Sequence, residues 1–322
     1  MNRRALLALL ASGSVLGTRF ALARSPDAAH RLGIFYAGWC DRWKDEIGAA
    51  LFKALAELGH VKGRNLTDKW CCFEMDFSRS AKVAVDLVRL EPDAILTTGT
   101  PTTRALQNAT KTIPIVTSVE DPVAGGFTET LGRPDGNITG LSHGHPESNA
   151  KEIELIRRVV PKLDRIVFID DVRYGGARQL MRSREMAARA AGLAAEVKIV
   201  ERSELERIFI DMKRVGTAAA LLYFVDLDQA EIAKLALRHG VPTILDADYV
   251  KHGGLMSFTM YHADFVQRTA SIIDKVFRGM KPAEIPWELP DRSHLVINLR
   301  TARLLGLNIP SDILLRADQV VE

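Results

Sequence analysis

Short apolar runs alternate with segments of helical periodicity along nearly the whole chain. Residues 32–36 predict a strand, and Ile47, Leu51 and Leu55 then recur at the spacing of a helix that ends at Gly59. Further strands are predicted at residues 66–73, 94–98 and 113–118, and further helices at 81–90 and from Pro101 onwards. Strands that alternate with helices pair in parallel, because the helix carries the chain back to the start of the next strand. This order predicts an α/β fold with a parallel sheet covered on both faces.

The same order begins again after a glycine-rich bridge at residues 136–144. The second series comprises helices at 149–159, 177–191, 203–215 and 228–239, and strands at 165–170, 194–200, 218–224 and 241–246. A chain of 322 residues is also longer than a single core usually supports. We therefore expect two doubly wound parallel-sheet lobes. A closed (βα)8 barrel would show the same alternation, but the glycine-rich break favours two lobes.

The last part of the chain predicts how the lobes are connected. After Gly253 and Gly254 come a strand at 255–258, a helix at 263–278 and a strand at 295–299. We expect residues 31–141 and 255–285 to form the N-terminal lobe. Residues 142–254 and 286–322 then form the C-terminal lobe, and the chain crosses between the lobes three times.

The N-terminus has the three parts of a secretory signal peptide. Arg3 and Arg4 precede an apolar run at 5–17, and residues 21–23 form a small-x-small cleavage site. Residues 1–23 are therefore predicted to be a signal peptide, although an N-terminal amphipathic or core helix is the alternative. Export could use the Sec or the twin-arginine route, and no cysteine follows the cleavage site to carry a lipid anchor. We expect a periplasmic protein.

Charge and cysteine content limit the remaining function classes. The net charge is +3 and the basic residues are scattered, which does not indicate a nucleic-acid partner. The three cysteines are Cys40, Cys71 and Cys72. We expect packed free thiols, with a bridge from Cys40 to one of the adjacent pair as the alternative. His143 and His145 lie on a glycine-containing loop, which we interpret as a plain loop rather than a metal site.

Candidate ligand contacts follow from the rule that open parallel sheets bind ligands just beyond the carboxyl ends of their strands. The residues at these positions are Trp39, Thr98, Gly99, Thr100, Thr102, Ser118, Asp121, Ser142, Asp170, Tyr174, Asp226, Asp246 and Tyr249. The threonine-rich segment 97–103 precedes a helix, so its hydroxyls and free N–H groups could hold a carboxylate. The alternative is that these threonines only cap the helix.

The acidic and aromatic candidates have equally simple alternatives. Asp121, Asp170, Asp226 and Asp246 could hold an ammonium group, but each could instead cap a turn or a helix. The aromatic rings could stack on a ligand or pack in the core. The motifs of a nucleophile elbow, a dinucleotide fold and a zinc protease are absent from the sequence, so we expect no cofactor and no catalytic residues.

Several segments resemble one family of transport proteins. Residues 87–106, 113–116, 121–123 and 133–142, together with C-terminal segments at 253–257 and 295–307, resemble ABC transporter substrate-binding proteins of the tryptophan/tyrosine type. The likeness runs from about residue 31 to the end. It departs at residues 170–176 and 224–226, where the family often has proline-containing turns, so the identity of the ligand does not carry over.

The resemblance implies a periplasmic binding protein type I fold that closes on a small ligand. It implies a role as the solute-binding component of an ABC importer, with a separate membrane permease as partner. We expect a monomeric chain. A ligand sensor that signals to a membrane kinase would have the same fold, and a secreted enzyme on this scaffold is a further alternative. We expect the first lobe to bind an anionic end of the ligand, and Asp226 or Asp246 to bind a cationic end.

Overall fold

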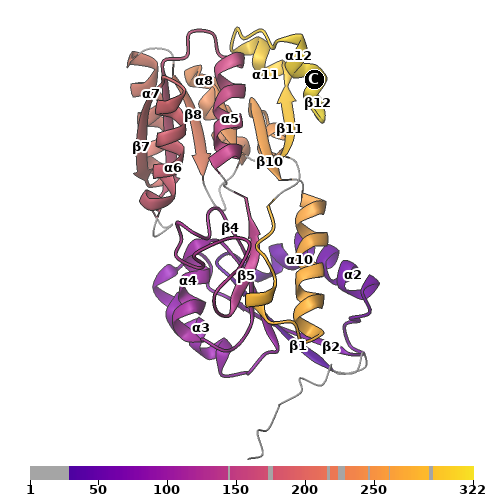
Figure 1. Ribbon diagram of the computed structural model, residues 1–322. Coiled ribbons are helices and arrows are strands. Elements are labelled where there is room, and N and C mark those ends of the chain that lie inside the picture. Colours follow the sequence, from indigo (N-terminus) through magenta and orange to yellow (C-terminus); the bar gives the residue numbers. More distant parts are fainter. Residues whose placement is uncertain are drawn as a thin grey trace, which may run out of the picture.

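The computed structural model has two α/β lobes, one above the other in Figure 1. It describes residues 29–143, 146–172, 177–215, 218–223, 229–245, 247–260, 262–289 and 293–322. The predicted signal peptide lies outside these residues. Two separate sheets, of five and seven strands, exclude the closed barrel and confirm the predicted fold class.

The first lobe is a parallel five-stranded sheet in the order β2-β1-β3-β4-β5. Its strands are β1 His30–Tyr36, β2 Leu66–Cys72, β3 Ala94–Thr98, β4 Ile115–Val119 and β5 Ile138–Ser142. Its helices are α1 Cys40–Trp43, α2 Ala49–Glu57, α3 Ser80–Val88, α4 Thr100–Ala109 and α10 His262–Phe277. Alternate side chains of β1 face opposite layers: Ile34 packs with α2 and α10, and Phe35 packs with α3 and α4. Both faces of the sheet are therefore buried.

The second lobe has seven strands in the order β12-β11-β10-β9-β8-β6-β7, parallel except for the antiparallel β10–β11 pair. Its strands are β6 Arg165–Asp171, β7 Ala194–Val200, β8 Ala218–Tyr223, β9 Thr243–Leu245, β10 Met256–Met260, β11 Ser293–Asn298 and β12 Gln319–Val321. Its helices are α5 Pro146–Val159, α6 Ala177–Ala190, α7 Leu205–Val215, α8 Gln229–His239, α9 Ala247–Lys251, α11 Leu299–Leu304 and α12 Ser311–Arg316. Most of these elements lie within a few residues of their predicted positions.

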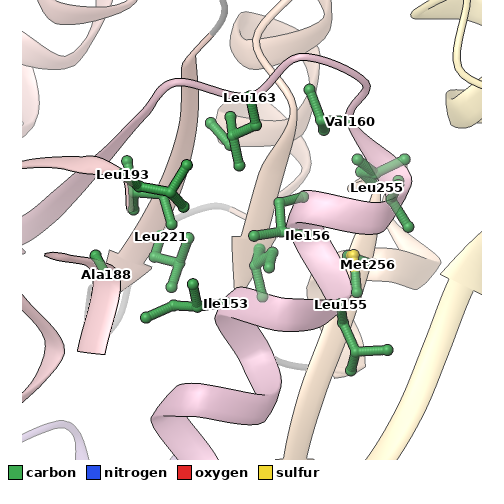
Figure 2. Close-up of a cluster of buried hydrophobic side chains, with 14 of the residues drawn as sticks. Ile153, Leu155, Ile156, Val160, Leu163, Ala188, Leu193, Leu221, Leu255 and Met256 are labelled. Carbon is green, nitrogen blue, oxygen red and sulfur yellow. The ribbon is translucent and has the colours of Figure 1, made fainter. Parts of the chain in front are cut away.

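The core of the second lobe shows why the helical periodicity was informative. Ile153 and Ile156 lie on one side of α5, Val160 directly follows the helix, and all three belong to one cluster with Leu221 of β8 and Met256 of β10 (Figure 2). Each of these five side chains is at most 2% exposed. Residues spaced by three or four positions share one face of a helix, so this spacing turns one side of α5 into the sheet. Their burial is a main source of the stability of this lobe.

The structure corrects the predicted lobe boundaries in two places. Strand β10 belongs to the second sheet, where it pairs with β9 and β11, so the chain returns to the first lobe with α10 and not at residue 255. The segment after α10 also stays longer in the first lobe, because Trp287 packs in its core and the Glu288 N–H donates to the Gly140 carbonyl. The observed crossings therefore follow β5, β10 and residue 289.

The glycine-rich bridge contains a strand that sequence analysis did not assign. Strand β5 pairs with β4 along its whole length, and Gly140 faces Thr117 in this register. A Cβ atom on Gly140 would lie 1.7 Å from the Thr117 carbonyl oxygen. Only glycine allows the two backbones to approach this closely.

Replacing Gly140 by alanine is expected to destabilise the protein by about 3 kcal/mol or more, because the added methyl group meets backbone that cannot rotate away. Chemical denaturation of Gly140→Ala measures this loss. Gly132→Ala is the matched control, since a Cβ atom there would meet no atom within 4 Å. Equal stability of the two variants would contradict the close-packing explanation.

A disulfide bond joins Cys40 to Cys72, with a Cα–Cα distance of 5.6 Å. The expectation of free thiols is wrong for this pair, and the alternative bridge is the observed arrangement. Adjacent residues of β2 point to opposite faces, so only Cys72 reaches α1. Cys71 remains a free, half-buried thiol, and burial raises its pKa. The bond ties the loop after β1 to the end of β2.

Removal of the bridge in the double variant Cys40→Ser/Cys72→Ser is expected to lower the free energy of unfolding by about 3–4 kcal/mol, because the closed loop spans 32 residues. Denaturant titration with and without reductant measures the effect. The variant Cys71→Ser, which keeps the bridge, should lose much less stability. If the free energy of unfolding of the wild type were the same with and without reductant, the disulfide bond would not be formed in the protein.

Candidate functional site

The order of the strands places one candidate site in the first lobe at the boundary between β1 and β3. These neighbours in the sheet are not consecutive in the chain, so the connections that follow them lead to opposite sides. Such topological switch points leave a crevice beyond the carboxyl ends of the strands. Trp39 follows β1 and is 46% exposed, Thr98 is the last residue of β3, and Gly99 and Thr100 follow it. The structure therefore brings these predicted residues to the same edge of the sheet.

Helix α4 begins at this edge with its N–H groups directed away from the helix body. Gly99 has a φ of +90°, which a side chain would strain, and it precedes Thr100 at the first helical position. The Thr103 N–H already donates to the Gly99 carbonyl, whereas the earlier N–H groups have no partner within the helix. The end of the helix therefore favours a negatively charged ligand group.

The threonines of this segment separate into structural and accessible members. The buried Thr102 hydroxyl donates to the carbonyls of Thr98 and Gly99, so it supports the turn, although no side chain caps the N–H groups of this helix. Thr98 and Thr100 are half-buried, and their hydroxyls have no hydrogen-bond partner among the described residues. Thr98, Gly99 and Thr100 are therefore the members of the segment that remain available to a ligand.

Three further candidates of the first lobe lie at the ends of β4 and β5: Ser118 within β4, Asp121 after it, and Ser142 as the last residue of β5. Ser118 lies 3.1 Å (Oγ to Nδ1) from His143, and the Ser142 hydroxyl donates to the Glu120 carbonyl at 2.8 Å. Asp121 accepts hydrogen bonds from the N–H groups of the two residues after Pro122, at 3.0 and 2.9 Å. Asp121 thus caps a turn, which was the alternative to ammonium binding.

The predicted residues of the second lobe have different surroundings. Asp170 is the penultimate residue of β6 and lies next to β8, at the equivalent switch point of the second sheet, and it is 4% exposed. Tyr249 is fully buried, and its hydroxyl lies 2.5 Å from the Thr243 hydroxyl in the core. The structure corrects the prediction that the Tyr249 ring stacks on a ligand: the ring packs in the core, and neither of its faces is exposed to solvent. Tyr174, Asp226 and Asp246 lie outside the described residues.

Two residues that were not predicted connect the lobes. Arg184 of α6, in the second lobe, donates to the Glu120 carboxylate of the first lobe at 2.6 Å. Their side chains are 7% and 20% exposed. Burial opposes ionisation of Glu120, but the guanidinium group of Arg184 and the nearby His143 together outweigh it and hold the pKa of Glu120 below its usual value. The position of Glu120 directly after a strand could have indicated it, but Arg184 is inside a helix and has no such signal.

Asp170 belongs to the same group of charges. Burial and the nearby Glu120 carboxylate raise the pKa of Asp170 to about 7, against the smaller opposing effects of the Asp171 N–H and of Arg184. Asp171 adds a further negative charge beside it. Where the lobes meet, Glu120, Asp170 and Asp171 thus lie near the cation of Arg184. This arrangement favours a ligand group with positive charge.

Asp170 is expected to make stability depend on pH between about 4 and 7. Its carboxyl group binds a proton more tightly in the folded chain than in the unfolded chain, where its pKa is near 3.8. The protonated group's contribution is therefore complete below about pH 4 and is lost as the pH rises through about 7. Asp170→Asn should be more stable than the wild type at pH 8, by up to about 4 kcal/mol, with the difference vanishing towards pH 4.

Denaturant titrations from pH 4 to 8 measure this difference. Asp86→Asn is the control, because the hydrogen bond from Lys82 lowers the pKa of the exposed Asp86. Its pH dependence should have the opposite sign: the stabilisation that Asp86 contributes is present above about pH 4 and lost below it. Parallel pH profiles of wild type and Asp170→Asn would contradict the burial of a protonated carboxyl group.

Two hinged α/β lobes with facing switch points define a type I periplasmic-binding-protein fold, in which the site lies between the lobes. The chain belongs to the ABC transporter substrate binding protein family, because the family model matches residues 44–321. No helix of the described residues combines the length and the hydropathy needed to cross a membrane.

Individual relatives agree with this membership. A tyrosine-binding protein of Clostridioides difficile (strain R20291) is 25% identical over 272 residues, which cover 82% of this chain and 77% of the relative. The ABC domain from Streptococcus pneumonia in complex with L-Trp has a TM-score of 0.80 and 24% identity, with 91% of this chain and all of that chain covered. A conserved domain protein from Vibrio cholerae has a TM-score of 0.79 and 23% identity over 91% of this chain and 99% of its own. These two structures have the same fold.

Proposed function

We propose that this chain is the periplasmic solute-binding component of an ABC importer and captures an amino-acid-like ligand between its two lobes. The observation that carries this proposal is the opposition of two switch points: the N-terminal end of α4 in the first lobe and the acidic end of β6 in the second. One end suits a carboxylate and the other an ammonium group. The names of the tyrosine-binding relative and of the L-Trp complex support an aromatic amino acid.

Several of the predicted residues have a role in this proposal. Thr98, Gly99 and Thr100 bind the carboxylate through hydroxyl and N–H groups, and Trp39 stacks on the side chain of the ligand. Asp170 binds the ammonium group from the second lobe, together with Asp226 or Asp246. Hinge motion at the three crossings then closes the lobes on the ligand. The ligand is released unchanged, because the role of the family is binding and not turnover.

The remaining features of the proposal concern the place of the protein in the cell. Residues 1–23 direct export and are removed, and the closed, monomeric protein docks on a membrane permease that is a separate chain. The membership of the ABC transporter substrate binding protein family supports a permease partner rather than a signalling kinase.

Binding is tested by calorimetry with a panel of amino acids and organic acids that includes L-tryptophan and L-tyrosine. We expect saturable one-to-one binding of at least one aromatic amino acid. Thr98→Val and Thr100→Val should each weaken that binding about tenfold or more, because each loses a hydrogen bond to a charged group. Thr67→Val is the control, since Thr67 is an exposed threonine at the opposite end of the same sheet. A panel without any saturable ligand would contradict the proposal.

A further inference from the structure

The disulfide bond lies directly beside a candidate ligand contact. Cys40 is the first residue of α1 and follows Trp39, whose side chain is 46% exposed. Its partner Cys72 is the last residue of β2, where the pairing of β1 with β2 ends at Tyr36 and Cys72. The bond therefore fixes the start of α1 to the end of the neighbouring strand, one residue after Trp39.

The chain is also held on the other side of Trp39. Ala37 and Gly38, which separate β1 from Trp39, are both buried. The Met75 N–H donates to the Ala37 carbonyl at 2.5 Å, and a Cβ atom on Gly38 would lie 2.8 Å from the ring of Tyr36. The exposed Trp39 ring is thus carried by a single residue between a packed segment and the disulfide.

The first turn of the helix has weak contacts of its own. Helix α1 has only four residues, and a π-helical stretch, Lys44–Gly48, separates it from α2. The Trp43 N–H lies 3.4 Å from the Trp39 carbonyl oxygen, a long hydrogen bond, and the Trp39 side chain does not cap the helix.

Core packing holds the end of α1 and not its start. Trp43, at the end of α1, is buried, and its ring centroid lies 5.4 Å from that of Tyr36 and 5.3 Å from that of Trp70. The start of the helix has the covalent bond of Cys40 in place of such packing. The backbone around Trp39 therefore depends on the disulfide.

We propose that the Cys40–Cys72 disulfide positions the Trp39 ring for ligand binding. This role rests on the proposed function, in which the Trp39 ring stacks on the side chain of the ligand. Without the bond, the backbone of residues 38–40 has more conformations, and binding must then order the ring at a cost in entropy. Both cysteines are positioning residues that act through Trp39 and need not contact the ligand.

Calorimetry with L-tryptophan as the probe tests this role. The double variant Cys40→Ser/Cys72→Ser should bind L-tryptophan about threefold to tenfold more weakly than the wild type, as expected when one side chain must be ordered on binding. Cys71→Ser keeps the bridge and should bind as the wild type does. An unchanged affinity of the double variant would overturn the proposal.

A variant without the ring separates positioning from a general loss of structure. Trp39→Ala should bind L-tryptophan more weakly than the wild type. Removal of both cysteines from Trp39→Ala should then cause no further loss, because the bond acts through the ring. An equal loss of affinity with and without Trp39 would show that the bond supports the lobe in general, and would contradict the assigned role.

The folded state of each variant is checked by its circular dichroism melting curve, and binding is measured well below the melting temperature. If the double variant does not fold, treatment of the folded wild type with dithiothreitol removes the bond without a substitution. Trp39→Ala treated in the same way then supplies the comparison. The same outcomes support or overturn the proposal.

The position of the ring is also measured without any ligand. The chain has four tryptophans, so protein labelled with 5-fluorotryptophan has few fluorine resonances, and Trp39→Phe identifies the one from Trp39. Loss of the disulfide should broaden this resonance or divide it, because the ring then occupies several positions. An unchanged Trp39 resonance would overturn the proposal. A protein that binds no amino acid would refute the proposed ligand class, while the fluorine spectra would still decide whether the bond positions the ring.

Discussion

The parallel pairing of strands is the constraint on which the rest of this structure depends. Each crossover helix brings the chain back to the same end of the sheet, so the carboxyl ends of all parallel strands lie along one edge. In both lobes this edge faces the other lobe (Figure 1). Residues that are distant in the sequence, such as Trp39, Thr98 and Asp170, therefore lie where the lobes meet.

Charge distribution gives the two edges different chemistry. The first lobe presents hydroxyl and N–H groups around Gly99, which suit an anion, and the second presents the buried carboxyl group of Asp170. Burial keeps the pKa of Asp170 near 7. The neighbouring Arg184 lowers this pKa only in part, because its guanidinium group donates to Glu120. The ion pair between the lobes thus lies beside the carboxyl group of Asp170, and both of its members affect the pKa of that group.

The two lobes also differ in how their edges are held. In the first lobe the disulfide of Cys40 and Cys72 and the close approach of Gly140 to Thr117 fix the loops around the sheet. In the second lobe, Tyr249 of α9 is fully buried, and its hydroxyl lies 2.5 Å from that of Thr243 in β9.

Local pattern alone determined the order of the elements, because apolar periodicity and helix-end residues depend on neighbours in the sequence. It also placed Trp39, Thr98 and Asp170 at strand ends. Only the tertiary structure decided that Cys40 pairs with Cys72, that β5 runs through the glycine-rich bridge and that β10 belongs to the second sheet. It likewise brought Arg184 to Glu120 and enclosed Tyr249 in the core. These features depend on contacts between distant segments, and such contacts leave no periodic signal in the sequence.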